Sequence, residues 1–224
     1  MATWVKICGN TTLEDAQLAV ELGADALGFI FAESKRRITP AQAAKIISNL
    51  PQHVESVGVV YSRDADEIVA IVQEAGLTAV QLHGGMDLAL VDRLRERLGD
   101  KVDLIQTLHW IVGTDSSEKL RSELREITAA GTMDRVLIDS RVGAAGGGTG
   151  VSFDWDAARS LFAEASAKDL RVIVAGGLRP ENVAEAIYQL RPWGVDVSSG
   201  VEASPGCKAA EKLSAFLRAA KASQ

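Results

Sequence analysis

The residues of this 224-residue sequence that could carry out chemistry stand where short β-rich runs end. A thiol, Cys8, ends the first run, and a carboxyl, Asp139, ends the sixth. A thiol acts as a base near neutral pH only if its pKa falls below its ordinary value of about 8.5. A carboxyl acts as an acid there only if its pKa is raised, which a closed and partly apolar site can do. The structural alternatives are a small core cysteine and an aspartate that accepts hydrogen bonds from loop amides.

Further polar groups end other runs. Gln81 and His83 are two residues apart, so their side chains point the same way along a strand. Both could line a site, although His83 could equally be a hydrogen-bonded structural histidine. The glycine pair at 176–177 and the run 198–200 (Ser-Ser-Gly) could bring backbone close to a ligand, but glycine pairs at strand ends are often only turns.

The order of these runs indicates a barrel. The β-rich runs lie near residues 3–9, 26–32, 56–62, 79–84, 103–110, 135–140, 171–177 and 194–201, and the amphipathic stretches near 12–22, 40–50, 64–75, 87–98, 116–130, 155–165, 180–190 and 209–222. Strict alternation predicts parallel strands joined by crossover helices. A doubly wound open sheet would carry a nucleotide-binding glycine turn after the first strand, and residues 8–11 lack that spacing. We therefore predict one (β/α)8-barrel (TIM-barrel) domain over residues 1–224, with its site at the carboxyl ends of the strands.

Composition and charge narrow the class of function. The chain is 47% hydrophobic and 24% charged, which is ordinary for a globular protein. Its net charge of −6 and the lack of a basic stripe argue against a nucleic-acid partner. The first residues do not resemble a signal peptide and no apolar run is long enough to span a bilayer, so we expect a cytoplasmic protein without a membrane partner. The cysteines are few and far apart, and no Cys/His cluster has metal spacing, so neither a metal nor a cofactor is predicted.

The strand ends resemble the phosphoribosylanthranilate isomerase family of tryptophan biosynthesis. The matching segments occur in family order and span nearly the whole chain, which makes them specific together although each is weak alone. They are 5–9 (Val-Lys-Ile-Cys-Gly), 23–31, 34–37 (Ser-Lys-Arg-Arg), 80–84, 137–140, 147–150 with 153–155, 176–183 and 196–202.

The resemblance implies a reaction and assigns roles. The family converts N-(5-phosphoribosyl)anthranilate into an aminoketose by an Amadori rearrangement that needs no metal or redox cofactor. An acid protonates the ring oxygen, the ring opens to an imine, and a base removes a proton from the neighbouring sugar carbon. Cys8 matches the base and Asp139 the acid. Arg36 matches the residue that binds the anthranilate carboxylate, which a guanidinium suits because two N–H groups fit two oxygens.

The resemblance also places the substrate phosphate at the loops after strands seven and eight. Gly176 and Gly177 let backbone approach closely, and Ser198, Ser199 and Gly200 offer hydroxyls and amides, helped by the positive end of a short helix. A phosphosugar is thus the expected partner. The glycine-rich stretch 143–150 is expected to be a mobile loop over the site, with a flexible connection as the alternative.

Two charged residues are predicted to lie beneath Cys8. Lys6 shares a strand face with Cys8, and its positive charge would favour the thiolate. Asp196 shares a face with Ser198 on the eighth strand, which neighbours the first in a closed barrel. We therefore predict that Asp196 pairs with Lys6 within about 4 Å and moderates its effect on Cys8. With Gln81 and His83, these two residues complete the expected substrate-binding set.

The sequence leaves three points open: the choice of arginine, the role of Cys207 and the oligomeric state. Arg37 is an alternative to Arg36, since adjacent arginines are usually a solvated turn. The family often has a lysine directly after the last loop glycine, whereas here Cys207 stands between Gly206 and Lys208, and Cys207 receives no role. The chain could be a monomer or a homodimer.

Three other functions compete with this interpretation. A histidine-pathway or dual-substrate isomerase performs the same rearrangement on a substrate with two phosphates, but it uses an aspartate where this chain has Cys8. A metal-dependent pentose-phosphate epimerase needs paired histidines and aspartates that the sequence does not display. A non-catalytic phosphosugar-binding barrel would be expected to have lost the acid or the base, and both are present.

Overall fold

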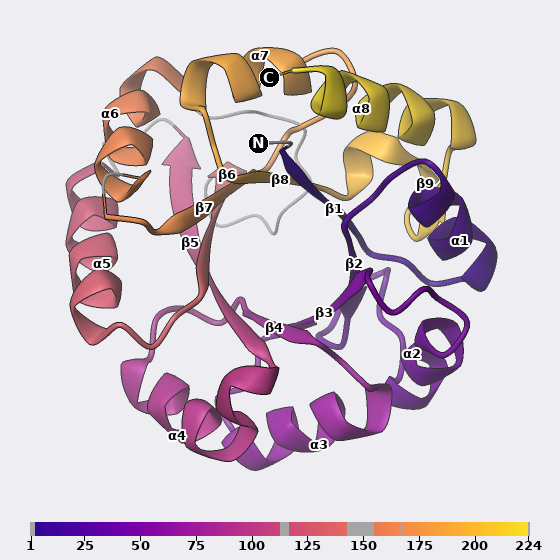
Figure 1. The fold of residues 1–224 in the computed structure, drawn as a ribbon, viewed down its shortest axis with the longest axis horizontal. Coiled ribbons are helices and arrows are strands. Elements are labelled where there is room, and N and C mark those ends of the chain that lie inside the picture. Colours follow the sequence, from indigo (N-terminus) through magenta and orange to yellow (C-terminus); the bar gives the residue numbers. More distant parts are fainter. Residues whose placement is uncertain (1–2, 113–116, 143–154, 167, 224) are drawn as a thin grey trace.

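The protein is a closed barrel of eight parallel strands ringed by helices, as predicted (Figure 1). The computed structural model describes residues 3–112, 117–142, 155–166 and 168–223. The barrel strands are β1 (Trp4–Cys8), β2 (Ala26–Ile30), β3 (Glu55–Val60), β4 (Ala79–Leu82), β5 (Asp103–Val112), β6 (Arg135–Val142), β7 (Arg171–Ala175) and β8 (Gly194–Val197). They neighbour one another in chain order, and β8 closes against β1.

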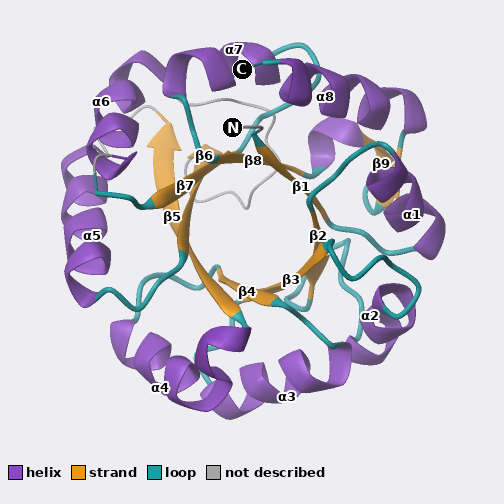
Figure 2. Ribbon diagram, viewed as in Figure 1, coloured by secondary structure: helices purple, strands orange, loops and turns teal. Residues whose placement is uncertain are grey.

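The helices form an outer ring around the strands (Figure 2). They are α1 (Leu13–Glu21), α2 (Pro40–Ile47), α3 (Ala65–Ala75), α4 (Leu88–Leu98), α5 (Ser117–Ala130), α6 (Trp155–Ser166), α7 (Val183–Leu190) and α8 (Ala210–Ala222). None of the helices in the described part of the chain has both the length and the apolar character needed to cross a bilayer.

Local sequence sets where several helices begin. Thr12, Asp64 and Asp87 each accept a hydrogen bond from a backbone N–H in the first turn, as expected of N-caps. Thr39 and Gln42 form a reciprocal capping box at the start of α2, with Pro40 in the first turn. These bonds satisfy N–H groups that have no partner within the helix. The start of each of these helices is therefore stabilised by residues next to it in the sequence.

Several predicted boundaries differ from the structure, and two of them beside the site differ by three or more residues. The eighth strand ends at Val197 rather than near 201, and a short 3-10 helix, η2 (Ser199–Val201), follows it. Helix α7 begins at Val183 rather than 180, because Pro180 lies in a turn that precedes it. A two-stranded antiparallel ribbon of β9 (Glu202–Ser204) and β10 (Cys207–Lys208) was not predicted.

The core has two parts. Most buried apolar side chains lie between the strands and the helices, where they form one continuous cluster. A smaller cluster fills the barrel interior with Trp4, Ala26, Val57, Ala79, Ile105, Leu137, Ile173 and Ala175. Because side chains alternate along each strand, the residues two positions beyond this inner layer point into the carboxyl-terminal end of the barrel. Several of them are polar: Lys6 follows Trp4, Gln81 follows Ala79 and Asp139 follows Leu137, and Cys8 lies two positions beyond Lys6.

A buried arginine closes the opposite end of the barrel. The guanidinium of Arg135 lies over two neighbouring indoles, 5.1 Å from the ring centre of Trp4 and 5.2 Å from that of Trp193, and the two ring centres are 5.1 Å apart. It donates to Glu55 at 2.7 Å and also to Asp103. Cation–π and ion-pair contacts thus tie β1, β3, β5 and β6 together at the end remote from the site.

We expect Arg135→Ala to lower the free energy of unfolding by about 3 kcal/mol, because it removes a fully buried side chain and leaves two carboxylates without their partner. Arg171→Ala is the matched control, since Arg171 also lies over Trp193 but is exposed, and we expect it to cost about 1 kcal/mol at most. Urea unfolding followed by tryptophan fluorescence measures both. Equal losses in the free energy of unfolding of the two variants would contradict the role of Arg135 in closing this end of the barrel.

Candidate active site

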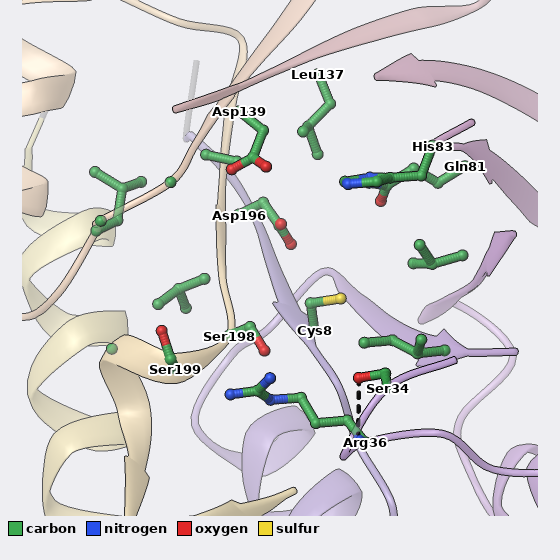
Figure 3. Close-up of a pocket in the computed structure, with 18 of the residues that line it drawn as sticks. Cys8, Ser34, Arg36, Gln81, His83, Leu137, Asp139, Asp196, Ser198 and Ser199 are labelled. Atoms are coloured by element: carbon green, nitrogen blue, oxygen red, sulfur yellow. Dashed lines mark hydrogen bonds between the residues drawn. The ribbon is translucent and has the colours of Figure 1, made fainter. Parts of the chain in front are cut away.

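A pocket of about 310 Å³ opens at the carboxyl ends of the strands. Cys8 lies in its middle, with Arg36, Ser198 and Ser199 on one side and Asp139 and His83 on the other (Figure 3). The sequence-predicted residues that line it are Cys8, Arg36, Gln81, His83, Asp139, Gly176, Gly177, Asp196, Ser198, Ser199 and Gly200. Lys6 does not line it, because its side chain is fully buried beneath the floor.

The predicted pair beneath Cys8 is confirmed. Lys6 Nζ donates to Asp196 Oδ1 at 2.7 Å, and the two residues are direct partners in the register of β1 and β8. Burial acts to lower the pKa of Lys6, but Asp196 and Cys8 together raise it above its ordinary value. Lys6 is therefore charged and held by its partner, and it cannot reach a substrate in the pocket.

The expectation of a depressed pKa for Cys8 was wrong. Burial raises the pKa of the Cys8 thiol by more than Lys6 lowers it, and Asp196 raises it further. The two charges act in the predicted directions, yet removal of the thiolate from water is the larger effect. The pocket therefore holds a mainly protonated thiol near neutral pH.

A glycine on the neighbouring strand gives Cys8 its space. A Cβ built on Gly28 would lie 2.8 Å from Cys8 Sγ and 3.1 Å from Lys6 Cε. No side chain fits there while the thiol keeps its place. The sequence carried a signal for this, since Gly28 interrupts an otherwise apolar strand, which often marks a close approach.

Arg36 enters the pocket and Arg37 does not. Arg36 is held by Glu202, which accepts from Nε at 2.8 Å and from Nη2 at 2.6 Å, whereas Arg37 is exposed. The hydrogen bond to Glu202 raises the pKa of Arg36. Burial acts to raise the pKa of Glu202, but Arg36 and Lys208 lower it overall, so the carboxylate stays ionised. In the described part of the molecule Nη1 of Arg36 has no hydrogen-bond partner.

The inserted Cys207 does not displace the lysine that follows it. Cys207 pairs with Ser204 and Lys208 with Glu202, so the unpaired residue of the bulge is Ala203 on β9, and Cys207 keeps its place in the ribbon with its side chain exposed. Lys208 is buried, and its Nζ donates to the backbone oxygen of Cys8 at 2.5 Å and to Glu202 at 3.1 Å. Glu202 and Lys208, to which the sequence assigned no role, thus tie Arg36 and the Cys8 backbone to the last loop.

Two loops form the side of the pocket predicted for phosphate. Gly176 and Gly177 have φ of +84° and +66°, a region that favours glycine, and a Cβ on Gly176 would crowd Ser140 and Asp139. Ser198 Oγ is buried and has no hydrogen-bond partner among the described residues. The predicted help from a helix dipole is small, because η2 spans only Ser199–Val201. The hydroxyls and backbone amides themselves remain as anion donors.

Asp139 has a neighbour that the sequence did not single out. His109 on β5 is the direct partner of Asp139 on β6, with Nδ1 3.9 Å from Oδ2. The rings of His83 and His109 are 4.9 Å apart. His109 lies near the end of the predicted run 103–110, as other site residues do in their runs, so its position was a usable signal. The glycine-rich stretch 143–150, expected to cover the site, lies outside the described residues.

The sequence profile of the N-(5'-phosphoribosyl)anthranilate (PRA) isomerase family matches residues 5–219. The chain belongs to this family. The prediction of an isomerase of tryptophan biosynthesis on a (β/α)8 barrel is thereby confirmed.

Individual PRA isomerases match along their whole length. That of Trichlorobacter lovleyi is 43% identical over 219 residues, which cover 97% of both chains. The crystal structure of the Thermotoga maritima enzyme superposes with a TM-score of 0.83 at 36% identity and covers 98% of this chain and 99% of that one. A PRA isomerase in complex with reduced 1-(o-carboxyphenylamino)-1-deoxyribulose 5-phosphate superposes with a TM-score of 0.79, at 36% identity and with the same coverage.

We expect Lys6→Met to raise the pKa of the Cys8 thiol and Asp196→Asn to lower it, because the first removes a positive charge and the second a negative one. The rate of alkylation by iodoacetamide as a function of pH measures this pKa. Cys207→Ser is the background for all variants, since Cys207 is an exposed thiol that would also react. Shifts in the same direction, or none, would contradict the electrostatic interpretation.

Proposed function

We propose that the pocket carries out the Amadori rearrangement of N-(5-phosphoribosyl)anthranilate with Cys8 as the general base and Asp139 as the general acid. The observation that carries this proposal is their placement. Cys8 ends β1 and Asp139 lies on β6, so a thiol and a carboxyl reach one pocket from separate walls of the barrel. A base and an acid on different sides of a sugar suit a reaction that protonates one atom and deprotonates another.

The remaining lining residues would orient the substrate. The phosphate would lie at Gly176, Gly177 and the Ser198–Gly200 segment, which line the pocket and include the buried Ser198 hydroxyl that has no partner among the described residues. The anthranilate carboxylate would meet Nη1 of Arg36, because Glu202 already holds the other two nitrogens of the guanidinium. These two anchors fix the ribose between Cys8 and Asp139, which is how binding at remote groups assists the chemical step.

Proton transfer would then proceed in two stages. Asp139 protonates the ring oxygen, the bond between that oxygen and the anomeric carbon breaks, and an imine forms. The Cys8 thiolate removes a proton from the neighbouring sugar carbon, giving an enolamine that becomes the ketone. Because burial raises the pKa of Cys8, only a minor fraction is thiolate at neutral pH. Lys6 and Lys208 both act to lower that pKa and so increase this fraction.

Cys8→Ser and Asp139→Asn should each lower kcat by about 100-fold or more with the fold intact, because each removes one proton-transfer group. Turnover of freshly generated phosphoribosylanthranilate is followed by the loss of its fluorescence, and circular dichroism reports folding. Cys207→Ser is the matched cysteine control and should keep wild-type kcat, since Cys207 is outside the pocket. A folded wild-type protein without turnover would favour a phosphosugar-binding barrel.

Arg36→Met should raise KM by about 10- to 100-fold, because it removes a charge-assisted hydrogen bond to the carboxylate. Arg37→Met should leave KM unchanged, because Arg37 points to solvent. Comparison of the two variants shows whether Arg36 or Arg37 binds the carboxylate, which the sequence left open. An equal change in KM for both variants would contradict the assignment of Arg36.

The substrate with two phosphates of the histidine pathway is the alternative. The described lining of the pocket carries one lysine or arginine side chain, Arg36, apart from the glycine and serine segments of the β7 and β8 loops, which supports a substrate with one carboxylate and one phosphate. We further propose that the enzyme is cytoplasmic and that residues 1–224 form one domain. We propose that it has no nucleic-acid partner and that it is a monomer or a homodimer. One related structure is of monomers made from the dimeric Thermotoga maritima enzyme. Light scattering would decide between the two states here.

A further inference from the structure

Three metal-ligating side chains converge at the mouth of the barrel. One ligand atom each from His83, His109 and Asp139 lies within 4.8 Å of the others. The residues come from three neighbouring strands, since His83 follows β4, His109 lies on β5 and Asp139 on β6. His83 and Asp139 both point into the pocket (Figure 3). The mechanism proposed above uses neither imidazole for proton transfer.

The donor set suits a transition metal. Two imidazole nitrogens and one carboxylate oxygen are ligands that Zn²⁺ and similar divalent ions prefer. At a metal–nitrogen distance of about 2.0–2.1 Å, ligand atoms of a tetrahedral ion lie about 3.3 Å apart. His109 Nδ1 and Asp139 Oδ2 are already 3.9 Å apart, so small side-chain rotations bring the three atoms to that spacing.

The surroundings support the same chemistry. The side chains of His109 and Asp139 are 21% and 11% exposed, so the cluster is shielded yet open to an entering ion. An imidazole that binds a metal through one nitrogen carries a proton on the other, which needs an acceptor. The Gln81 amide lies 3.4 Å from His83 Nδ1, and its Oε1 has no partner among the described residues. Rotation of that amide would turn Oε1 toward His83 and leave the other nitrogen for a metal.

We propose that His83, His109 and Asp139 form a binding site for a divalent transition-metal ion, and that bound metal inhibits the enzyme. A metal on the Asp139 carboxylate prevents that group from holding the proton it must give to the ring oxygen. Because His83 and Asp139 line the pocket, water or a substrate oxygen could complete the coordination of such an ion. The inhibition rests on the proposed role of Asp139, whereas the binding site does not.

Equilibrium dialysis with Zn²⁺ tests the site, in the Cys207→Ser background so that the exposed thiol does not contribute. We expect one ion per chain, and an affinity at least about tenfold weaker in His109→Gln. His53→Gln is the matched control, because His53 is the remaining histidine of the chain and is exposed outside the cluster. Cys8→Ser should retain the ion. No binding above background, or equal binding in wild type and His109→Gln, would overturn the site.

Inhibition is measured in an activity assay that is separate from the dialysis. In each variant, turnover with Zn²⁺ is divided by turnover with a chelator, so that any effect of the substitution itself cancels. We expect strong inhibition in wild type and His53→Gln and at least about tenfold less in His109→Gln. Metal bound without inhibition would overturn the inhibitory role and keep the site. A chelator-treated wild type without turnover would refute the proposed acid–base function, and dialysis would still decide on the site.

Discussion

The buried ion pair between Lys6 and Asp196 is the contact on which the site depends. It joins the first and last strands where the barrel closes, directly beneath Cys8. A charge this deeply buried is tolerated only with its partner, so loss of either side chain would leave an uncompensated charge in the floor of the pocket. The same pair sets the field at the thiol, because the lysine favours the thiolate and the aspartate opposes it.

The two ends of the barrel have different roles, one in stability and the other in forming the pocket. At the amino-terminal end, Arg135 lies over Trp4 and Trp193 and ties strands together. At the carboxyl-terminal end the same strands present Cys8 and Asp139 to a pocket. The reactive groups are thus placed at the end where loops and solvent surround them. The fold can hold reactive groups there because it is stabilised elsewhere.

The last loop links binding to catalysis. Glu202 holds Arg36 at the edge of the pocket, and Lys208 bonds both Glu202 and the backbone of Cys8. The groups proposed to bind the carboxylate and to move the proton therefore share one buried network of charges. Such a network is rigid because each member satisfies another, so a change in the loop would be felt at both places. Cys207 keeps its place in the β9–β10 ribbon, and Lys208 after it still reaches this network.

The sequence by itself determined the barrel and most of the pocket. Alternating β-rich and amphipathic runs dictate parallel strands, and every strand end then faces the same side, which is why Cys8 and Asp139 could be placed in one site. The resemblance to the isomerase family added Arg36. Tertiary structure decided what depends on distance between strands. The pKa of Cys8 is set by the balance of burial and opposing charges. The approach of His83 and His109 to Asp139 is decided by the register of neighbouring strands, which the alternation of runs does not fix.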